Sequence, residues 1–296
     1  MQINIPPDRH VLIAGPTASG KSALALKIAQ AQGGLVVNAD ALQVYDGWRI
    51  LTARPDDHDL AAAPHALYGH IGTDSPYSVG DWLKDVAPLF PKQRVIIVGG
   101  TGLFFEALTK GLAPIPPISD EIRAQADGMT PEALRAALDT ETRARIDLHN
   151  RARVQRAWEV QAQTGQSITR WQAETPAPML ALEDTTPLVL EAPKEWLTPR
   201  IETRFQQMLA QGVLDEARMM APNWNPHAPS SKAIGAAELI AHVRGEMTRE
   251  DAAQAVTIAT RQYAKRQRTW FRKRMKDWHQ ITMPSTDLST VFNFQH

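Results

Sequence analysis

The fold class follows from eight residues near the N-terminus, Gly15-Pro16-Thr17-Ala18-Ser19-Gly20-Lys21-Ser22. They match the pattern G-x-x-x-x-G-K-[ST] of a phosphate-binding P-loop. The apolar run His10–Gly15 predicts a buried strand before this loop, and the helix formers Ser22–Ala31 predict a helix after it. This order brings backbone N–H groups, a lysine and a helix N-terminus around one anion. The loop is therefore predicted to bind a diphosphate or a nucleotide such as ATP.

Two more apolar runs, Leu35–Asp40 and Arg94–Gly100, predict further strands. Strands that alternate with helices at this spacing predict a parallel sheet flanked by helices, an α/β fold with a P-loop NTPase-like core. In open α/β sheets the ligand crevice lies beyond the carboxyl ends of the strands. Asp40 and Thr101 follow two of these ends, so we expect the chemistry there.

The middle of the chain has a different composition. A proline-rich linker, Ala113–Pro117, precedes a stretch rich in Arg, Ala and helix formers, Ser119–Trp171. A second proline-rich segment, Pro176–Pro178, precedes the predicted strand Thr186–Glu191. We therefore predict an inserted all-helical domain at 119–185, between core segments 1–118 and 186–296. The second core segment is expected to be mostly helical from Thr198 to Trp278.

The composition excludes several classes of protein. The 296 residues include no cysteine, which excludes disulfides, thiolate nucleophiles and cysteine-based metal sites. The chain has neither the features of a signal peptide nor an apolar run of about 20 residues that could span a membrane, so we expect a cytoplasmic protein without membrane contact. The formal net charge is zero, yet Arg261–Lys276 holds eight basic residues and no acid. Such segregation is typical of a surface for an anionic partner.

The P-loop alone does not determine the reaction. In a typical P-loop ATPase another strand ends on an Asp that holds Mg²⁺. Here the strand Val95–Val98 runs into Gly99-Gly100-Thr101-Gly102, which contains no acid. The nearest carboxylate at a strand end is Asp40, which the residues by themselves allow to be a metal ligand, a general base or a helix N-cap.

Further motifs make the sequence specific. In order along the chain they are Asn38–Tyr45, Thr52–Pro55, Pro64-His65, Gly99–Phe105, Arg200–Phe205 and Thr260–Gln267. Together with the P-loop they resemble the tRNA dimethylallyltransferase (tRNA isopentenyltransferase) family over nearly the whole chain. The resemblance is to the bacterial form, which has no appended zinc finger.

The resemblance implies a reaction in which dimethylallyl diphosphate donates its prenyl group to the N6 amine of the adenosine 3′ to the anticodon in tRNA. It implies that Asp40 is the general base, that Arg204 contacts the diphosphate and that Thr101 hydrogen-bonds the reacting site. Ser22 is the expected ligand of Mg²⁺. The diphosphate is expected to bind the P-loop residues Gly15, Pro16, Thr17, Ala18, Ser19, Gly20, Lys21 and Ser22.

The family also implies contacts with the anticodon stem-loop of tRNA. Gln43 is expected to offer both a donor and an acceptor to the edge of a flipped adenine. Near the C-terminus Arg261, Lys265, Arg268, Arg272 and Lys276 are spaced to line one helix face. Such a face is often only solvated surface, but the family resemblance favours binding of RNA phosphates. The expected tRNA contacts are Asp40, Ala41, Leu42, Gln43, Thr101, Arg123, Arg153, Val154, Gln155, Arg156, Arg261, Lys265, Arg266 and Arg268.

Two departures from the family pattern and three alternatives remain. Ala41 stands where the family has Ser, and Ala236 where a Tyr is common, which puts one RNA or structural contact in doubt. The alternatives are a small-molecule kinase, a prenyltransferase acting on free adenine nucleotides, and an RNA-binding module with a regulatory P-loop. Family precedent leads us to expect a monomer.

Overall fold

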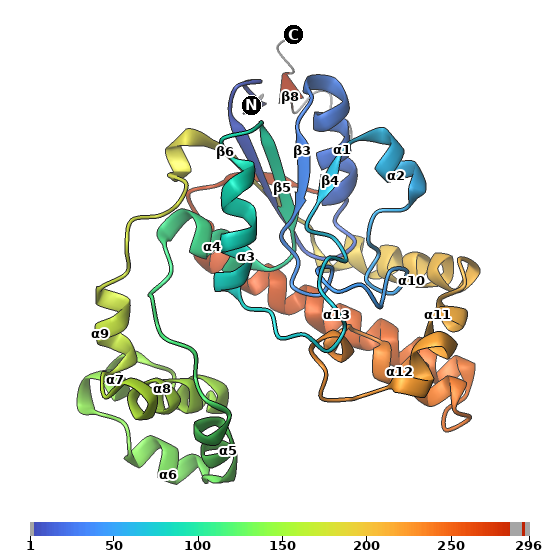
Figure 1. Cartoon of the computed structure of the whole chain (residues 1–296). Coiled ribbons are helices and arrows are strands. Elements are labelled where there is room, and N and C mark those ends of the chain that lie inside the picture. The colour runs from blue at the N-terminus through green and yellow to red at the C-terminus, as the bar shows by residue number, and fades with distance from the viewer. Residues whose placement is uncertain (1–2, 285–291, 294–296) are drawn as a thin grey trace. The chain divides into compact units, whose positions relative to one another are not determined.

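The computed structural model describes residues 3–284 and 292–293 and divides the chain into two compact units (Figure 1). One unit is Met1–Thr109 with Leu180–His296, and the other is Lys110–Met179. The predicted insertion, 119–185, starts later and ends later than the second unit. The outermost residues of the predicted core segments, 1–2, 285–291 and 294–296, lie outside the described residues.

The first unit is built on a parallel six-stranded sheet, as predicted. Its strand order is β4-β3-β5-β2-β6-β7. The three central strands are almost entirely buried, which explains their unbroken apolar sequence. The strands are β2 (His10–Ala14), β3 (Leu35–Asn38), β4 (His65–Ala66), β5 (Val95–Gly99), β6 (Thr185–Glu191) and β7 (His279–Thr282).

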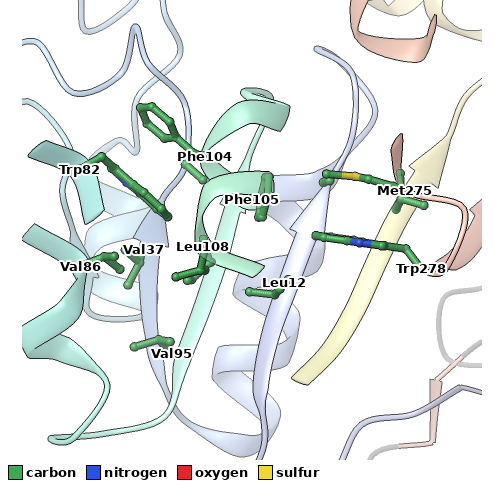
Figure 2. Packing of buried hydrophobic residues seen from close by; sticks show 14 of the residues in the cluster. Leu12, Val37, Trp82, Val86, Val95, Phe104, Phe105, Leu108, Met275 and Trp278 are labelled. Atoms are coloured by element: carbon green, nitrogen blue, oxygen red, sulfur yellow. The ribbon is translucent and has the colours of Figure 1, made fainter. Parts of the chain in front are cut away.

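Helices cover both faces of this sheet, and alternate residues of each strand enter two different cores. Val11 and Ile13 pack with helix α1 (Lys21–Gln32), whereas Leu12 packs on the opposite face. That opposite core contains Trp82 of α3 (Val79–Val86), Phe105 of α4 (Gly102–Lys110), and Trp278, which follows the long C-terminal helix (Figure 2). Trp82 also donates a hydrogen bond from Nε1 to the carbonyl oxygen of Asn38 at 2.8 Å, at the end of β3.

The rest of the first unit is mostly helical, as predicted from Thr198 to Trp278. Four helices make up this part: α10 (Lys194–Ala210), α11 (Val213–Met220), α12 (Ala236–Val243) and α13 (Arg249–Arg274). Their shared core includes Phe205, Val213 and Val256 and also takes in Trp48 and Leu51 from the loop after β3. This packing places that loop beside α10 and α13.

The second unit is all-helical, as the composition indicated. Its helices are α5 (Asp120–Gly128), α6 (Pro131–Ala136), α7 (Thr140–Arg145), α8 (Arg151–Thr164) and α9 (Ile168–Ala173). Ser, Thr, Asp or Asn side chains cap all five at their N-termini. The unit has its own apolar core, which includes Ala126, Leu134 and Val154.

Several short elements could not be predicted from the sequence because they are too short for a periodic pattern. They are the strands β1 (Ile3–Asn4) and β8 (Phe292–Asn293), which pair in parallel with each other, the strands β4 and β7, the helix α2 (Asp57–Ala62), and the 3-10 helices η1 (Ala87–Leu89), η2 (Leu182–Asp184), η3 (Ala221–Asn223) and η4 (Pro229–Lys232).

Candidate active site

Three predicted motifs follow three neighbouring strands of the sheet. Strand β5 lies between β3 and β2. All three strands are parallel, so their carboxyl ends meet at one edge of the sheet. Asp40 follows β3, Thr101 follows β5, and the P-loop follows β2. The sheet thus brings together residues that are separated by up to about 80 positions in the sequence.

The P-loop is held from both sides. Ala18 has a φ of 61° and Gly20 a φ of 88°, the left-handed backbone of a tight anion-binding turn. Arg200 of α10 donates from Nε to the carbonyl oxygen of Ala18 at 2.9 Å. Gln267 of α13 accepts the backbone N–H of Thr17 at 2.8 Å. The Thr17 N–H therefore points to a protein partner, and the Ser19 N–H donates to the carbonyl oxygen of Pro16 at 3.2 Å. An anion would have to bind the other N–H groups of the loop.

Lys21 lies at the inner end of the P-loop. Its ammonium donates to the carbonyl oxygen of Pro16 at 3.3 Å. The pKa of Lys21 is lowered to about 8, mainly by burial; the charge of Asp40 opposes this shift, and the charge of Arg204 adds to it. Burial also lowers the pKa of Arg204. Two partly desolvated cations beside one carboxylate form a site that an incoming anion would stabilise.

Asp40 is held in place by hydrogen bonds to its side chain and to its backbone. Its carboxylate oxygen Oδ1 accepts the backbone N–H of Leu42 at 3.0 Å. The residues after it form a turn, not a helix, so Asp40 closes a local turn and is not a helix N-cap. Asn38, which is fully buried, accepts the Asp40 N–H at 2.8 Å and donates to the Asp40 carbonyl oxygen at 3.0 Å. With Oδ1 engaged, Oδ2 is the oxygen available for chemistry.

Thr101 supports the Asp40 turn. Its Oγ1 accepts the backbone N–H of Ala41 at 2.9 Å, and its own N–H donates to the Ala39 carbonyl oxygen at 3.1 Å. Burial, followed by the charge of Asp40, raises the pKa of Tyr263. Thr101 is not among the residues that line the pocket described next.

A pocket, called the inner pocket below, opens beside Asp40. Its lining includes the polar and charged residues Thr17, Lys21, Asp40 and Arg204. It also includes an apolar wall of Leu51, Phe205, Met208 and Val256, which belong to one buried cluster. Charged groups and an apolar wall in one pocket suit a ligand with an anionic head and a hydrocarbon tail. The remaining lining residues are Leu42, Gln43, Thr52, Ile201, Ile234, Thr260 and Tyr263.

Gln43 lies in the inner pocket, but the expectation that it offers both a donor and an acceptor to a base needs correction. Its Nε2 donates to the carbonyl oxygens of Thr52 at 2.8 Å and Ala53 at 2.9 Å. Both amide hydrogens are therefore engaged within the protein. Only its side-chain oxygen remains as an acceptor.

A wider cleft, called the outer cleft below, shares Lys21, Gln43, Arg204 and Met208 with the inner pocket. Ser22 lines this cleft, and its side chain is exposed at the start of α1. A hydroxyl next to a phosphate cradle fits Mg²⁺, which prefers few protein ligands together with phosphate oxygens and waters. Within residues 3–284 and 292–293, one group of three His and carboxylate side chains lies close enough together to hold a metal ion: Asp56, His58 and Asp59, which also line the outer cleft.

The basic residues near the C-terminus lie mainly on α13. Lys265 and Arg266 are exposed, whereas Arg261 and Arg268 are partly buried. Nη1 of Arg261 lies 3.7 Å from Oε1 of Glu202, and the guanidinium of Arg266 lies over the ring of Tyr263. The helix ends at Arg274, so Lys276 does not belong to the predicted helix face. Phe271 of the same helix is buried in the sheet core.

The other predicted RNA contacts lie in the second unit. Arg123 is exposed on α5, and Arg153 and Arg156 are exposed on α8. Gln155 donates to Asp127 at 2.7 Å. Val154 is 2% exposed and packs in the core of the unit, so the prediction that it contacts tRNA is wrong for its side chain. One of four consecutive helical residues must face inward because the helix repeats every 3.6 residues.

The residues that hold the site in place were not assigned from the sequence. They are Asn38, Arg200, Tyr263 and Gln267, and each lies within or next to a quoted motif. Their position in the motifs was the available signal. Their partners lie on other strand ends or helices, so their roles could be recognised only in the folded chain.

Comparisons with known proteins identify the family of the chain. The model of the IPP transferase family matches residues 43–274, and that of isopentenyl transferase matches residues 9–68. A relative from Dinoroseobacter shibae named tRNA dimethylallyltransferase is 61% identical over 277 residues, which is 92% of this chain and 94% of the relative. A second relative of the same name, from Ruegeria sp., is 58% identical over 94% of this chain and 97% of its own length.

Solved structures show the same fold. A tRNA isopentenylpyrophosphate transferase from Bacillus halodurans is 28% identical, with a TM-score of 0.69, over 95% of this chain and 92% of its own. In addition, no helix of residues 3–284 and 292–293 has the length and apolar character needed to cross a membrane. From its motifs, its fold and these relatives, the chain belongs to the IPP transferase family, the family of tRNA dimethylallyltransferases that its sequence resembles.

Proposed function

We propose that this protein transfers the dimethylallyl group of dimethylallyl diphosphate to the N6 amine of the adenosine 3′ to the anticodon in tRNA, and releases diphosphate. The observation that carries the proposal is the inner pocket, whose lining combines the cations Lys21 and Arg204 and the carboxylate of Asp40 with an apolar wall. The names of the relatives support the same class of substrate. With tRNA as the proposed substrate, we place the reaction in the cytoplasm. From family precedent, we propose that the protein acts as a monomer.

The diphosphate would bind at the P-loop. Lys21, Arg204 and the N–H groups of Gly20, Lys21 and Ser22 would neutralise the charge that grows on the departing oxygen. Mg²⁺, held by the Ser22 hydroxyl and by diphosphate oxygens, would supply further charge neutralisation when bound. The half-buried Lys21 favours this use, because a bound anion compensates the cost of keeping its ammonium out of water.

The prenyl group would lie against the apolar wall, with Leu51, Phe205 and Met208 excluding water from the carbon that reacts. The adenine nitrogen attacks that carbon, the carbon–oxygen bond breaks, and the diphosphate leaves with the bonding electrons. Oδ2 of Asp40 accepts the proton that the amine loses as the new carbon–nitrogen bond forms. The hydrogen bonds of Asn38 and Leu42 keep this oxygen in place during the step.

The tRNA would contact the basic residues of α13, a helix that continues from Thr260 and Tyr263 in the inner pocket to the exposed Arg266 and the partly buried Arg268. Contacts between these residues and RNA phosphates would make binding dependent on salt. The exposed arginines of α5 and α8 are proposed as additional phosphate contacts.

The test is mass spectrometry of tRNA nucleosides after incubation of the pure protein with unmodified tRNA, Mg²⁺ and dimethylallyl diphosphate. We expect dimethylallyl adenosine at the position 3′ to the anticodon, and none when ATP replaces dimethylallyl diphosphate. Parallel reactions with AMP, ADP or ATP as acceptors should give no prenylated nucleotide. Unmodified tRNA in the complete reaction would refute the proposal, and prenylated free nucleotides without prenylated tRNA would replace it with another acceptor.

A further inference from the structure

We propose that Gln267 is a positioning residue that sets the P-loop, where the diphosphate binds, relative to the strand end beside which Asp40 acts. This inference rests on the proposed function, because it concerns the alignment of the leaving group with the base. Gln267 is on α13 and is 5% exposed.

The side-chain amide of Gln267 joins two loops. Its Oε1 accepts the backbone N–H of Thr17 at 2.8 Å, and its Nε2 donates to the carbonyl oxygen of Gly100 at 3.0 Å. Thr17 belongs to the loop after β2, and Gly100 to the loop after β5. One partner is a donor and the other an acceptor, so a neutral amide satisfies both and a hydrocarbon satisfies neither.

The connection continues to Asp40. Thr101, next to Gly100, binds the backbone of Ala39 and Ala41 on either side of Asp40. The three strand ends are therefore linked in order from the P-loop through Gln267 and Thr101 to Asp40. Gln267 supplies the one contact in this series that comes from a helix instead of from the strand-end loops.

The space around Gln267 is tight. A Cβ added to Gly100 would lie 2.3 Å from Nε2 of Gln267 and 3.1 Å from Oδ2 of Asp40. Two residues further along the chain, a Cβ added to Gly102 would lie 2.2 Å from the ring of Trp270 on α13. The glycines thus let α13 approach the end of β5 closely enough for the amide to reach both loops.

Substitution Gln267→Met keeps the length of the side chain and removes both hydrogen bonds. We expect kcat to fall at least about tenfold and the KM for dimethylallyl diphosphate to rise by a similar factor, because Thr17 N–H and Gly100 C=O lose their partners. The KM for tRNA should change less than about twofold, because the exposed cations of α13 are unaltered. The matched control is Gln254→Met, at an exposed position of the same helix, which should behave like the wild type.

Substitution Gln267→Glu separates positioning from folding. A protonated glutamic acid can still accept from Thr17 and donate to Gly100, whereas the ionised carboxylate has no hydrogen to donate. The ratio of kcat/KM between this variant and the wild type should therefore fall as the pH rises from about 5.5 to 8.5, because burial raises the pKa of a carboxyl group. A loss of stability alone would not produce this dependence if thermal unfolding shows the variant folded at every pH.

A ratio that does not change with pH would overturn the inference, as would a folded Gln267→Met variant with the kcat and KM values of the wild type. Both results require an active wild-type protein. If the wild type itself leaves tRNA unmodified, the proposed function fails instead, so the two failures are distinguishable.

Discussion

The side chain of Asn38 holds the backbone of Asp40 at both its N–H, at 2.8 Å, and its carbonyl oxygen, at 3.0 Å. Asn38 also donates to the carbonyl oxygen of Leu67 at 3.0 Å, and its side chain is completely buried. The conformation of Asp40 therefore depends on a neighbour two residues earlier that does not line the inner pocket.

Substitution Asn38→Ala should impair both stability and catalysis. It leaves the Asp40 N–H and the Leu67 carbonyl oxygen without their partner, whereas the Asp40 carbonyl oxygen still accepts the N–H of Gln43. The free energy of unfolding should therefore fall by about 2 kcal/mol. Because Asp40 loses its alignment, kcat should fall about tenfold or more. Urea unfolding and prenyl transfer to tRNA measure the two effects. Asn223→Ala, at an exposed position, is the control. If Asn38→Ala has the kcat of the wild type, Asp40 keeps its place without Asn38.

Substitution Asp40→Asn should remove the base and keep the shape of the side chain. The amide can still accept from the Leu42 N–H but cannot take a proton, so kcat should fall about 10²- to 10⁴-fold. Binding of tRNA, measured by filter retention, should stay within about threefold of the wild type. The exposed Asp74→Asn serves as the control. Full activity in Asp40→Asn would require a different proton acceptor.

Binding of dimethylallyl diphosphate should take up a proton near pH 8. Burial lowers the pKa of Lys21 to about 8 in the free protein, and a bound diphosphate favours the charged ammonium and raises that pKa again. The affinity should therefore fall as the pH rises above about 8. Calorimetry at pH 8 in buffers with different ionisation enthalpies measures the uptake. In Lys21→Arg the uptake should disappear, because a guanidinium stays protonated; equal uptake in both proteins would assign the proton to another group.

Substitution Gly100→Ala should impair catalysis, whereas the same substitution at an open position should not. The new methyl group would meet Nε2 of Gln267 at 2.3 Å and Oδ2 of Asp40 at 3.1 Å, so one of these side chains must move. We expect kcat to fall at least about tenfold. Gly128→Ala provides the matched control, because nothing lies within 4 Å of the added atom there. Similar kinetics for the two variants would show that the loop relaxes without cost.

His10 should make the fold sensitive to acid. Its Nδ1 accepts the backbone N–H of Val95 at 3.1 Å, and burial, followed by the charge of Arg94, lowers its pKa below 6.5. The contribution of neutral His10 is complete above about pH 6.5 and is lost as the pH falls through the lowered pKa of the folded state. Denaturant unfolding between about pH 7.5 and 5 measures this loss.

In His10→Asn the side-chain oxygen can accept the same N–H without titrating, so this part of the acid sensitivity should disappear. The control variant His227→Asn, at an exposed position, should keep the acid sensitivity of the wild type. An unchanged pH dependence in His10→Asn would assign the effect to other groups.

The sequence by itself determined the class of the fold and the identity of the main chemical groups. The apolar runs at β2, β3 and β5 are continuous because strands buried on both faces have no polar side, and the P-loop pattern requires its glycines for a tight anion-binding turn. These are local requirements, so they can be read from neighbouring residues. The composition likewise predicted the helical second unit.

Only the tertiary structure decided how these groups are aligned. Gln267 joins Thr17 to Gly100 across sequence separations of 250 and 167 residues, and no local pattern encodes such contacts. Folding also buried Val154, which takes its side chain out of any RNA surface, and engaged both amide hydrogens of Gln43 in hydrogen bonds within the protein. The physical reason is that packing selects which face of a helix or turn is free, and periodicity alone leaves that choice open.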